Sequence, residues 1–383
     1  MREVEPVARK RILYVEPFHG GSHATYTRTL TEKIEADWTC LTLPGRHWKW
    51  RARGSAVYFA HRYPSELAQT YDLLWASSFL DLAAFVALCP QLKAHRKVLY
   101  FHENQLAYPS RKEFTGERDF HFGFTQMVSA LVADQCVFNS QWNLQSFLSA
   151  GSKLLKKMPD AVPPQWMETI RARSSVMGVP LDLPKTELVL ETPRGARETG
   201  PLILWNHRWE FDKAPEVFFD ALIKLKERDV PFRLAVCGER YARIPAAFEH
   251  AQSALKDRID HWGFLESKEA YQRLLMKSDI AVSTAKHEFF GISMLEATHF
   301  GARPLVPDRL SYRELFPSEY RYGDDQALLS ELSRLALDYV RGDNLRRDRG
   351  VITRPYGTSL LSQYTHFIAD TARLYPEGQS ALE

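Results

Sequence analysis

Short apolar runs alternate with longer amphipathic stretches along most of this chain. In the first half the runs lie at residues 11–15, 73–76, 98–101 and 135–138. Such short runs, bounded by turn residues, are typical of parallel strands that are buried on both faces. The stretches between them, such as residues 124–133, have the spacing of helices. The first half is therefore predicted to form a doubly wound sheet.

The same alternation starts again in the second half. Between the halves, residues 183–200 are rich in Pro, Thr, Glu, Arg and Gly and lack a sustained apolar period, so this segment is predicted to be a linker. Beyond it, strands are expected at residues 202–205, 233–237, 280–283 and 304–306, and helices at residues 215–227, 268–277 and 289–300.

Two such halves predict an α/β protein with two Rossmann-like, doubly wound domains that face a central cleft. A chain of 383 residues is long enough for two cores of ordinary size. Residues 1–185 would form the N-terminal domain and residues 200–350 the C-terminal domain. Residues 351–383 are helical in pattern, and we expect them to pack back on the N-terminal domain.

Composition narrows the class of protein only slightly. A net charge of +3 does not by itself indicate a nucleic-acid partner. The four cysteines are far apart and form no C-x-x-C pair, which is typical of reduced thiols in an intracellular protein. The N-terminus has no apolar signal core, and the most apolar long window, residues 73–90, contains Ser and Asp. We therefore expect a cytoplasmic protein without integral membrane contact.

Two carboxylates, Glu288 and Glu296, lie eight positions apart after the strand at residues 280–283. A helix advances about 100° per residue, so eight steps return a side chain to nearly the same face. The free N–H groups of the first helical turn would favour an anion between them. Carboxylates that accept sugar hydroxyls, beside N–H groups that hold phosphate, suit a nucleotide-sugar site. The alternative is an acidic N-terminus that stabilises the helix dipole, with one solvated glutamate.

Arg208 and Lys213 follow the first strand of the second half, where doubly wound sheets bind ligands. One guanidinium and one ammonium there would neutralise a diphosphate. The alternative is a pair of solvated surface charges. Because no Asp-x-Asp occurs in the sequence, a metal-bridged diphosphate has no evident ligands, and we expect neither a metal nor another cofactor.

The first half offers two weaker candidates for donor contact. Gly20 and Gly21, after the first strand, would let the backbone approach a phosphate, although a plain turn explains them equally well. His102, at the end of the strand at residues 98–101, could donate a hydrogen bond to a sugar hydroxyl or polarise the reacting centre. A histidine satisfied within the core is the alternative.

Residues 44–65 combine cations with aromatic rings and contain no Asp or Glu. Cations that hold phosphates, beside flat rings that stack on bases, are what single-stranded RNA recognition uses. A solvated loop anchored by its tryptophans and a patch that lies on anionic lipid are the alternatives. The cations are Arg46, Lys49, Arg51, Arg53 and Arg62, and the tryptophans are Trp48 and Trp50.

The motifs of the second half resemble those of the retaining GT-B glycosyltransferases of family 4, which carry an Arg/Lys pair and a Glu-x7-Glu element. The resemblance implies that Arg208 and Lys213 bind the donor diphosphate, that Glu288 binds the sugar hydroxyls and that Glu296 binds the ribose. The resemblance also implies that Arg208, Lys213, Glu288 and His102 are catalytic. It further implies a base-recognition loop at Gly263, Phe264 and Leu265, and phosphate-binding N–H groups at Phe290, Gly291 and Ile292.

Three segments of the first half are similar to the tRNA-queuosine α-mannosyltransferase family: YVEPFHGGSH at 14–23, LPGRHWKWR at 43–51 and FHENQLAYP at 101–109. This resemblance spans nearly the whole chain. It implies metal-independent, retaining transfer of mannose from GDP-mannose to queuosine at the wobble position of tRNA-Asp. The residues expected on the acceptor side are His19, His23, Arg46, Trp48, Lys49, Arg51, Arg53, His102, Glu103 and Asn104.

Three other functions stay open at this point. A glycosyltransferase that acts on a lipid or another small acceptor would use the basic and aromatic segment on a membrane surface. A nucleotide-sugar epimerase would convert the donor without an acceptor. A non-catalytic RNA-binding protein would leave the donor motifs unused.

Overall fold

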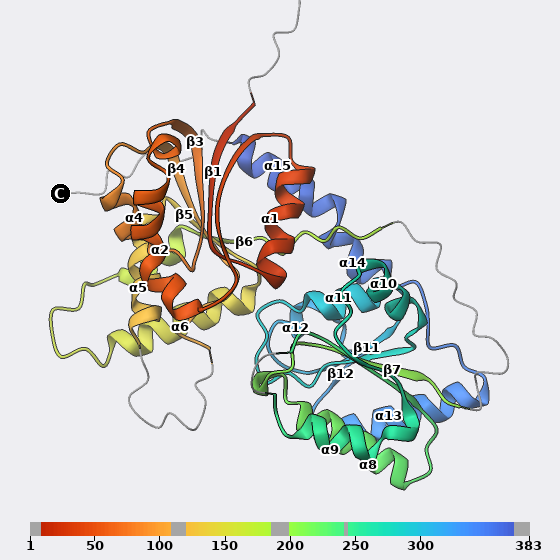
Figure 1. Ribbon diagram of the computed structural model, residues 1–383. Helices are drawn as coiled ribbons and strands as arrows, with labels where there is room; N and C mark the ends of the chain where they lie inside the picture. The colour runs from red at the N-terminus through yellow and green to blue at the C-terminus, as the bar shows by residue number, and fades with distance from the viewer. Residues whose placement is uncertain (1–8, 109–119, 185–198, 241–243, 371–383) are drawn as a thin grey trace, which may run out of the picture. The chain divides into compact units, whose positions relative to one another are not determined.

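Two units, each built around one parallel sheet, make up the chain (Figure 1). The first unit comprises residues 1–182 and 356–383, and the second comprises residues 183–355. The computed structural model describes residues 9–108, 120–184, 199–240 and 244–370.

The first unit has a six-stranded sheet in the order β2-β1-β3-β4-β5-β6, in which every neighbouring pair is parallel. Its strands are β1 (Arg11–His19), β2 (Asp37–Pro44), β3 (Thr70–Ser77), β4 (Lys93–Phe101), β5 (Gln135–Phe138) and β6 (Ser174–Val176). Its helices are α1 (Gly21–Lys33), α2 (Trp48–Arg62), α3 (Pro64–Leu67), α4 (Leu82–Leu88), α5 (His121–Val132), α6 (Gln141–Leu155), α7 (Trp166–Ala172) and α15 (Thr358–Ala369).

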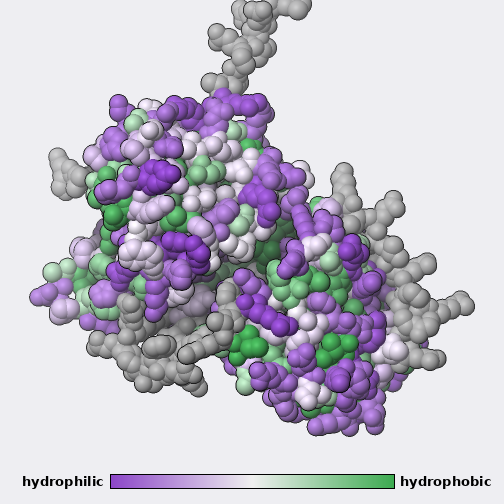
Figure 2. All heavy atoms as spheres, viewed as in Figure 1, coloured by the Kyte–Doolittle hydropathy of each residue, from purple (hydrophilic) through white to green (hydrophobic). Residues whose placement is uncertain are grey.

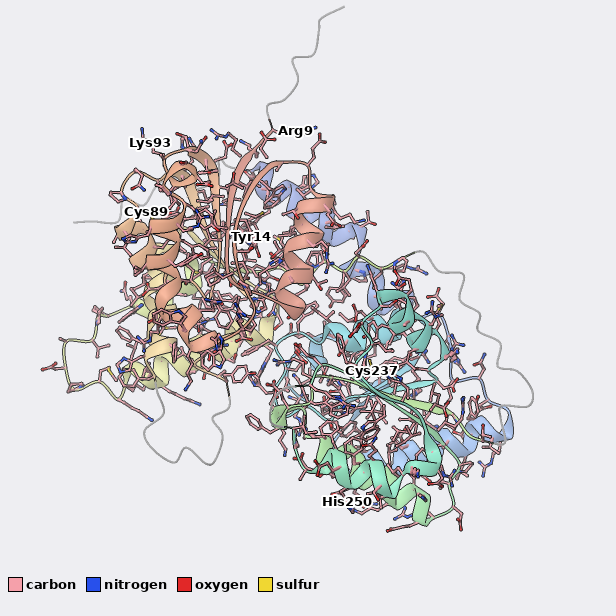
Figure 3. The ribbon with its side chains drawn as sticks, in the orientation of Figure 1. Arg9, Tyr14, Cys89, Lys93, Cys237 and His250 are labelled. Atoms are coloured by element: carbon pink, nitrogen blue, oxygen red, sulfur yellow. The ribbon has the colours of Figure 1, made fainter. Side chains whose placement is uncertain are left out.

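Helices cover both faces of this sheet, which is why consecutive residues in the middle of its strands are apolar. Leu13 and Val15 of β1 face a core that also contains Phe59 of α2 and Phe85 of α4. The intervening Tyr14 lies on the other face, toward α1, where Figure 3 labels it within the first unit. In Figure 1, α1 and α15 lie on one side of the sheet and α2 and α4 on the other.

The helix α15 belongs to the first unit although it follows the second in the chain. Its Tyr364 is fully buried, and the hydroxyl donates to the carbonyl of Gly178 at 2.7 Å. The hydroxyl of Tyr26 on α1 lies 3.3 Å from that of Tyr364. Trp75 of β3 packs against the rings of both Tyr364 and Phe367. The first core is therefore completed by the C-terminal helix.

The second unit repeats the architecture, with a parallel sheet in the order β12-β11-β10-β7-β8-β9. Its strands are β7 (Leu202–Asn206), β8 (Arg233–Cys237), β9 (Ile259–Gly263), β10 (Ile280–Val282), β11 (Arg303–Pro307) and β12 (Arg321–Tyr322). Its helices are α8 (Pro215–Glu227), α9 (Ala247–Ala254), α10 (Lys268–Lys277), α11 (Ile292–His299), α12 (Tyr312–Leu315), α13 (Asp325–Arg341) and α14 (Gly350–Thr353).

Several large aromatic side chains pack against one another in the core of the second unit. Trp205 of β7 is fully buried and packs against Phe218 of α8 and Phe248 of α9. Figure 1 shows α8, α9 and α13 on one side of this sheet and α10 and α11 on the other. Both faces are therefore covered, as in the first unit.

The prediction of two doubly wound α/β units is confirmed. Four strands that were not predicted, β2, β6, β9 and β12, lie at the edges of the sheets, where fewer side chains are buried. The second unit extends to residue 355, five residues beyond the expected boundary. The expected linker lies largely outside the described residues.

The visible surface of the chain is mainly hydrophilic, with scattered apolar patches (Figure 2). Among the described residues, no helix is both long enough and apolar enough to cross a membrane.

Candidate active site

Lys213 is the centre of a buried cluster of charged groups in the second unit. It ends a short 3-10 turn after β7, and only 6% of its surface is exposed. Its Nζ donates to the carbonyl oxygen of His287 at 2.9 Å and to Oε2 of Glu288 at 3.1 Å. The same Nζ lies 3.4 Å from Oδ2 of Asp212. The fold therefore brings together Lys213 and Glu288, which are separated by more than seventy residues.

The charges of this cluster offset the cost of their burial. Burial alone would lower the pKa of Lys213, but Glu288 and Asp212 raise it above its ordinary value. Burial would raise the pKa of Glu288, but the charge of Lys213 outweighs it and the pKa is lowered to about 2. Burial lowers the pKa of both His207 and His287 to about 4, and the positive charge of Lys213 adds to this lowering. At neutral pH the cluster holds an ammonium, an ionised Glu288 and two neutral imidazoles.

Arg208 lies at the exposed margin of the same cluster. Its Nη1 is 3.1 Å from Oε2 of Glu210, and 43% of its side chain is exposed. Its positive charge opposes the protonation of Lys213 and His287, so the buried groups sense it. The site therefore has one fixed cation, Lys213, and one exposed cation on a flexible side chain that can turn toward an anionic ligand.

The helix that follows Glu288 starts later than predicted. α11 begins at Ile292, because Gly291, with a φ of +112°, departs from the helical path just before it. Glu288 therefore lies in the preceding loop, and the predicted placement of both glutamates on one helix face is wrong. Oε1 of Glu288 accepts hydrogen bonds from the N–H groups of Phe289 and Phe290 at 3.1 and 3.4 Å. The N–H of Phe290, predicted to hold phosphate, points at a carboxylate in this structure.

Glu296 belongs to a second hydrogen-bonded group, which joins β7, α10 and α11. Its Oε2 accepts from the hydroxyl of Tyr271 at 3.0 Å, and that hydroxyl accepts from the amide of Asn206 at 3.0 Å. The amide of Asn206 also donates to the carbonyl of Ser293 at 2.9 Å. Burial raises the pKa of Glu296 to about 7, and the hydrogen bond from Tyr271 limits the rise. Neither Asn206 nor Tyr271 was predicted; only the place of Asn206 at a strand end could have indicated it.

The predicted base-recognition loop lies beyond the carboxyl ends of β8 and β9. Gly263 ends β9 and pairs in register with Cys237 at the end of β8, which Figure 3 labels inside the second unit. The following Phe264 is 58% exposed, unusual for a large apolar side chain in this unit. The backbone of Leu265 interacts with the thiol of Cys237.

In the first unit, Glu16 connects two of the predicted site histidines. Glu16 on β1 is fully buried, and His23 and His102 are 5% and 7% exposed. Nδ1 of His23 and Nε2 of His102 lie 3.1 and 3.7 Å from the same oxygen, Oε2 of Glu16. Burial, reinforced by His23, lowers the pKa of His102 well below its ordinary value. Glu16 was missed by sequence analysis, although a glutamate within an apolar strand was an available signal.

Among the described residues, Glu16, His23 and His102 form the group whose side chains could hold a metal ion, since their ligand atoms lie within 4.8 Å of one another. However, the two imidazoles are stacked, with centroids 4.0 Å and planes 29° apart. An imidazole binds metal through a lone pair in its ring plane, so an ion between these rings would lie outside both planes. In this structure His23 lies within hydrogen-bond distance of Glu16, and His102 is held against His23 by ring stacking.

Gly20 and Gly21 are at the start of α1, and Gly20 also has a packing role. A Cβ at Gly20 would lie 3.0 Å from Cα of Gly45, so the loops after β1 and β2 touch through their backbones. Gly21 adopts a φ of +52°. The preceding His19 is partly buried, and burial lowers its pKa.

Asn104 does not face a ligand, contrary to the prediction. It is fully buried, and its amide nitrogen donates to Oδ1 of Asn143 at 2.8 Å and to Oγ of Ser146 at 3.0 Å. Its amide oxygen accepts from the N–H of Ala107 at 2.8 Å. Asn104 therefore fixes the loop after β4. The neighbouring Glu103 is partly buried, and its carboxylate accepts from Gln105 at 2.9 Å.

The basic and aromatic segment at residues 44–65 forms mainly a helix, α2, and not a solvated loop. Trp50 is 66% exposed, whereas the ring of Trp48 lies 5.1 Å from that of Phe122 on α5. The guanidinium of Arg53 also covers the Phe122 ring, at 4.7 Å. We call this region the α2 surface; it comprises Arg46, Trp48, Lys49, Trp50, Arg51 and Arg53. None of its cations forms an ion pair with any carboxylate in the part of the chain that the structure describes.

Comparison with known proteins now identifies the family. The family model for the N-terminal domain of tRNA-queuosine alpha-mannosyltransferase matches residues 11–181, and that for glycosyl transferases group 1 matches residues 191–330. The tRNA-queuosine alpha-mannosyltransferase of Drosophila melanogaster is 40% identical over 331 residues, which cover 85% of this chain and 86% of that protein. The chain belongs to the tRNA-queuosine alpha-mannosyltransferase family. It is therefore an enzyme, a glycosyltransferase.

One relative matches part of the chain, and one solved structure shares its fold. A GDP-mannose-dependent alpha-(1-6)-phosphatidylinositol dimannoside mannosyltransferase of Mycobacterium tuberculosis is 33% identical over 116 residues, 30% of this chain and 29% of that protein. The solved structure of a sucrose-phosphate synthase from Thermosynechococcus elongatus has a TM-score of 0.67 at 14% identity. The match covers 94% of this chain and 98% of the synthase chain. The fold is the GT-B fold of glycosyltransferases, as predicted.

In this member of the tRNA-queuosine mannosyltransferase family, the candidate residues of the two units form separate groups. The Lys213 cluster and the Glu296 group lie in the second unit, and the Glu16 group and the α2 surface lie in the first. The roles of these residues in binding donor and acceptor stay predictions, with the exception of Asn104, whose side chain is fully engaged in the fold.

Proposed function

We propose that this enzyme transfers mannose from GDP-mannose to queuosine at the wobble position of tRNA-Asp. The observation that carries the proposal is the 40% identity, over 85% of the chain, to a tRNA-queuosine alpha-mannosyltransferase. Support for the donor comes from the relative in Mycobacterium tuberculosis, whose name includes GDP-mannose.

The buried cluster of the second unit suits a sugar diphosphate. Lys213 has a raised pKa and stays protonated, so it offers a permanent positive charge to a diphosphate. Arg208 supplies a second charge with a bidentate fork. Since charge develops on the departing phosphate in the transition state, cations fixed beforehand act most strongly at that point. With these two cations in place, we propose that no metal is needed.

The carboxylates have different environments and different proposed roles. Glu288 has a pKa of about 2, so it is ionised and can accept hydrogen bonds from mannose hydroxyls. Glu296, held by Tyr271, would accept from the ribose hydroxyls of the donor. The retaining step would occur on one face of the sugar: the departing phosphate oxygen accepts the proton of the acceptor hydroxyl while the new glycosidic bond forms. No side chain then needs to act as a covalent nucleophile.

The acceptor side is proposed to lie in the first unit. On the α2 surface, exposed cations stand beside exposed tryptophans, which fits the phosphates and unstacked bases of a single-stranded RNA loop. His23, which Glu16 orients by a hydrogen bond, and His102, which stacks on His23, are the proposed contacts to the sugar hydroxyls at the reacting centre.

The test uses labelled GDP-mannose and tRNA from matched strains with and without queuosine. We expect label only in tRNA that contains queuosine, and loss of labelling with Lys213→Met. Equal labelling of both tRNA pools would refute queuosine as the acceptor. Labelling from UDP-sugars alone would refute the donor. Label in phosphatidylinositol vesicles without tRNA would favour a lipid acceptor, and conversion of the donor without any acceptor would favour an epimerase.

A further inference from the structure

Arg240, which follows β8, has no role in the site described so far. Its guanidinium carbon lies 4.2 Å from the ring centroid of Trp209. Trp209 is itself 1% exposed and stacked on Phe248 at 4.0 Å, so the ring that supports Arg240 is rigid. The N–H of Trp209 also donates to the carbonyl of Glu239 at 3.0 Å, which fixes the backbone next to Arg240.

The donor groups of Arg240 are available to a ligand. Arg240 is exposed, and its guanidinium donates no hydrogen bond and forms no ion pair within the described residues. The predicted base loop lies directly beside it: a Cβ added at Gly263 would meet Nη2 of Arg240 at 2.9 Å. Gly263 also has a φ of +134°, which disfavours any side chain there. A glycine at this position therefore leaves room for the guanidinium beside the exposed ring of Phe264.

The order of the strands places Arg240 and Phe264 to one side of the Lys213 cluster, at the ends of β8 and β9. Lys213 and Glu288 follow β7 and β10, at the centre of the sheet, where the phosphates and sugar are proposed to bind. Glu296, proposed for the ribose, is held by Tyr271 on α10, the helix that follows β9. The base extends beyond the ribose, so it falls at the ends of β8 and β9, where Arg240 and Phe264 stand.

We propose that Arg240 is a specificity-determining residue that reads the base of the donor as guanine. The guanidinium would donate two hydrogen bonds to O6 and N7 of guanine, while Phe264 covers the flat face of the ring. Adenine places an amino group where guanine has O6, and uracil offers only one acceptor on the corresponding edge. This inference rests on the proposed function, because it assumes a GDP-sugar donor.

The experiment measures binding of nucleoside diphosphates to the full-length enzyme by calorimetry, without acceptor. Wild type, Arg240→Gln and Arg240→Lys are each titrated with GDP, UDP and 7-deaza-GDP, which lacks N7. The matched control is Arg228→Gln, an exposed arginine just before β8, at the opposite end of that strand. Thermal unfolding of each variant verifies that it is folded.

Loss of a bidentate contact predicts that Arg240→Gln weakens GDP binding by roughly 10- to 100-fold. UDP binding should not change, and Arg228→Gln should bind GDP as wild type does. Wild type should bind 7-deaza-GDP less tightly than GDP, and Arg240→Gln should bind the two alike.

Equal weakening of GDP and UDP by Arg240→Gln would overturn the proposal, because Arg240 would then act on the phosphates. An unchanged GDP preference in Arg240→Gln would also overturn it, while leaving the proposed GDP-mannose donor intact. A wild type that prefers UDP would instead refute the proposed donor itself. The two failures are therefore distinguishable.

Discussion

The two cations of the proposed diphosphate site should differ sharply in what they contribute to stability. Lys213 is buried and contacts Glu288 and Asp212, whereas the pair of Arg208 with Glu210 is partly exposed, at 43% and 25%. Removal of one partner from a buried pair costs about 3–5 kcal/mol, because it leaves an uncompensated buried charge. An exposed pair contributes about 0–1 kcal/mol. Both side chains are nevertheless proposed to stabilise the same developing charge.

We therefore expect Lys213→Met and Arg208→Met to lower turnover similarly, by roughly 10²- to 10³-fold at saturating donor. Only Lys213→Met should also lower the free energy of unfolding by about 3–5 kcal/mol, measured by urea denaturation. Lys286→Met is the matched control, since Lys286 is exposed and pairs with the exposed Glu216. It should change neither turnover nor stability.

The pH dependence of stability tests whether the charge of Glu288 causes the loss of stability in Lys213→Met. The pKa of Glu288 is lowered to about 2, so its stabilising effect is present above its ordinary range and is lost as the pH falls toward 2. The stability difference between wild type and Lys213→Met should therefore be largest near neutral pH and narrow between about pH 5 and pH 2. A difference that does not change with pH, or an equally large loss of stability in Arg208→Met, would refute this account.

Three further predictions concern the other groups. Because burial raises the pKa of Glu296 to about 7, donor binding should weaken as the pH falls through neutrality. Glu296→Gln should abolish this pH dependence, and a dependence that persists in the variant would mean that another group causes it. Glu16→Gln should misplace the histidines and so lower mannosyl transfer on the order of 10²-fold, without weakening GDP binding. The control is Ser129→Ala, which removes another buried hydrogen bond of the first unit and should preserve transfer. Lys49→Gln and Arg53→Gln should each reduce the slope of log affinity for tRNA against log salt by roughly 0.7, and an unchanged slope would exclude phosphate contact by the α2 surface.

The parts of the fold that follow from hydrophobic periodicity were predictable. The helices at residues 215–227 and 268–277 have the bounds that the sequence predicted, because each is long, amphipathic and clearly terminated. The edge strands β2 and β9 were missed because polar residues interrupt their apolar runs. Those polar residues are tolerated where a strand has only one neighbour.

The proximity of Lys213 and Glu288 was predictable, because two separate motifs suggested that both residues bind the same ligand. The candidate site was not predictable where a single backbone angle or a tertiary contact decides the outcome. The left-handed Gly291 delays α11 and moves Glu288 into a loop. Asn104 was wrongly assigned, since an amide that caps a loop has the same sequence signature as one that binds a ligand. Tyr271 has no sequence signal, because only the fold places it beside Glu296.

The contribution of α15 to the first unit has a consequence for how the protein is synthesised. A ribosome at about 5–20 residues per second needs roughly 9 to 35 seconds to translate the second unit, residues 183–355, after it has completed β6. During that interval Trp75 and Tyr100 lack Tyr364, which covers them in the finished chain. Tyr100 packs in turn against His102, so the histidine pair receives its complete support only after the C-terminal helix emerges. A nascent chain therefore carries an unfinished first unit until α15 has been translated.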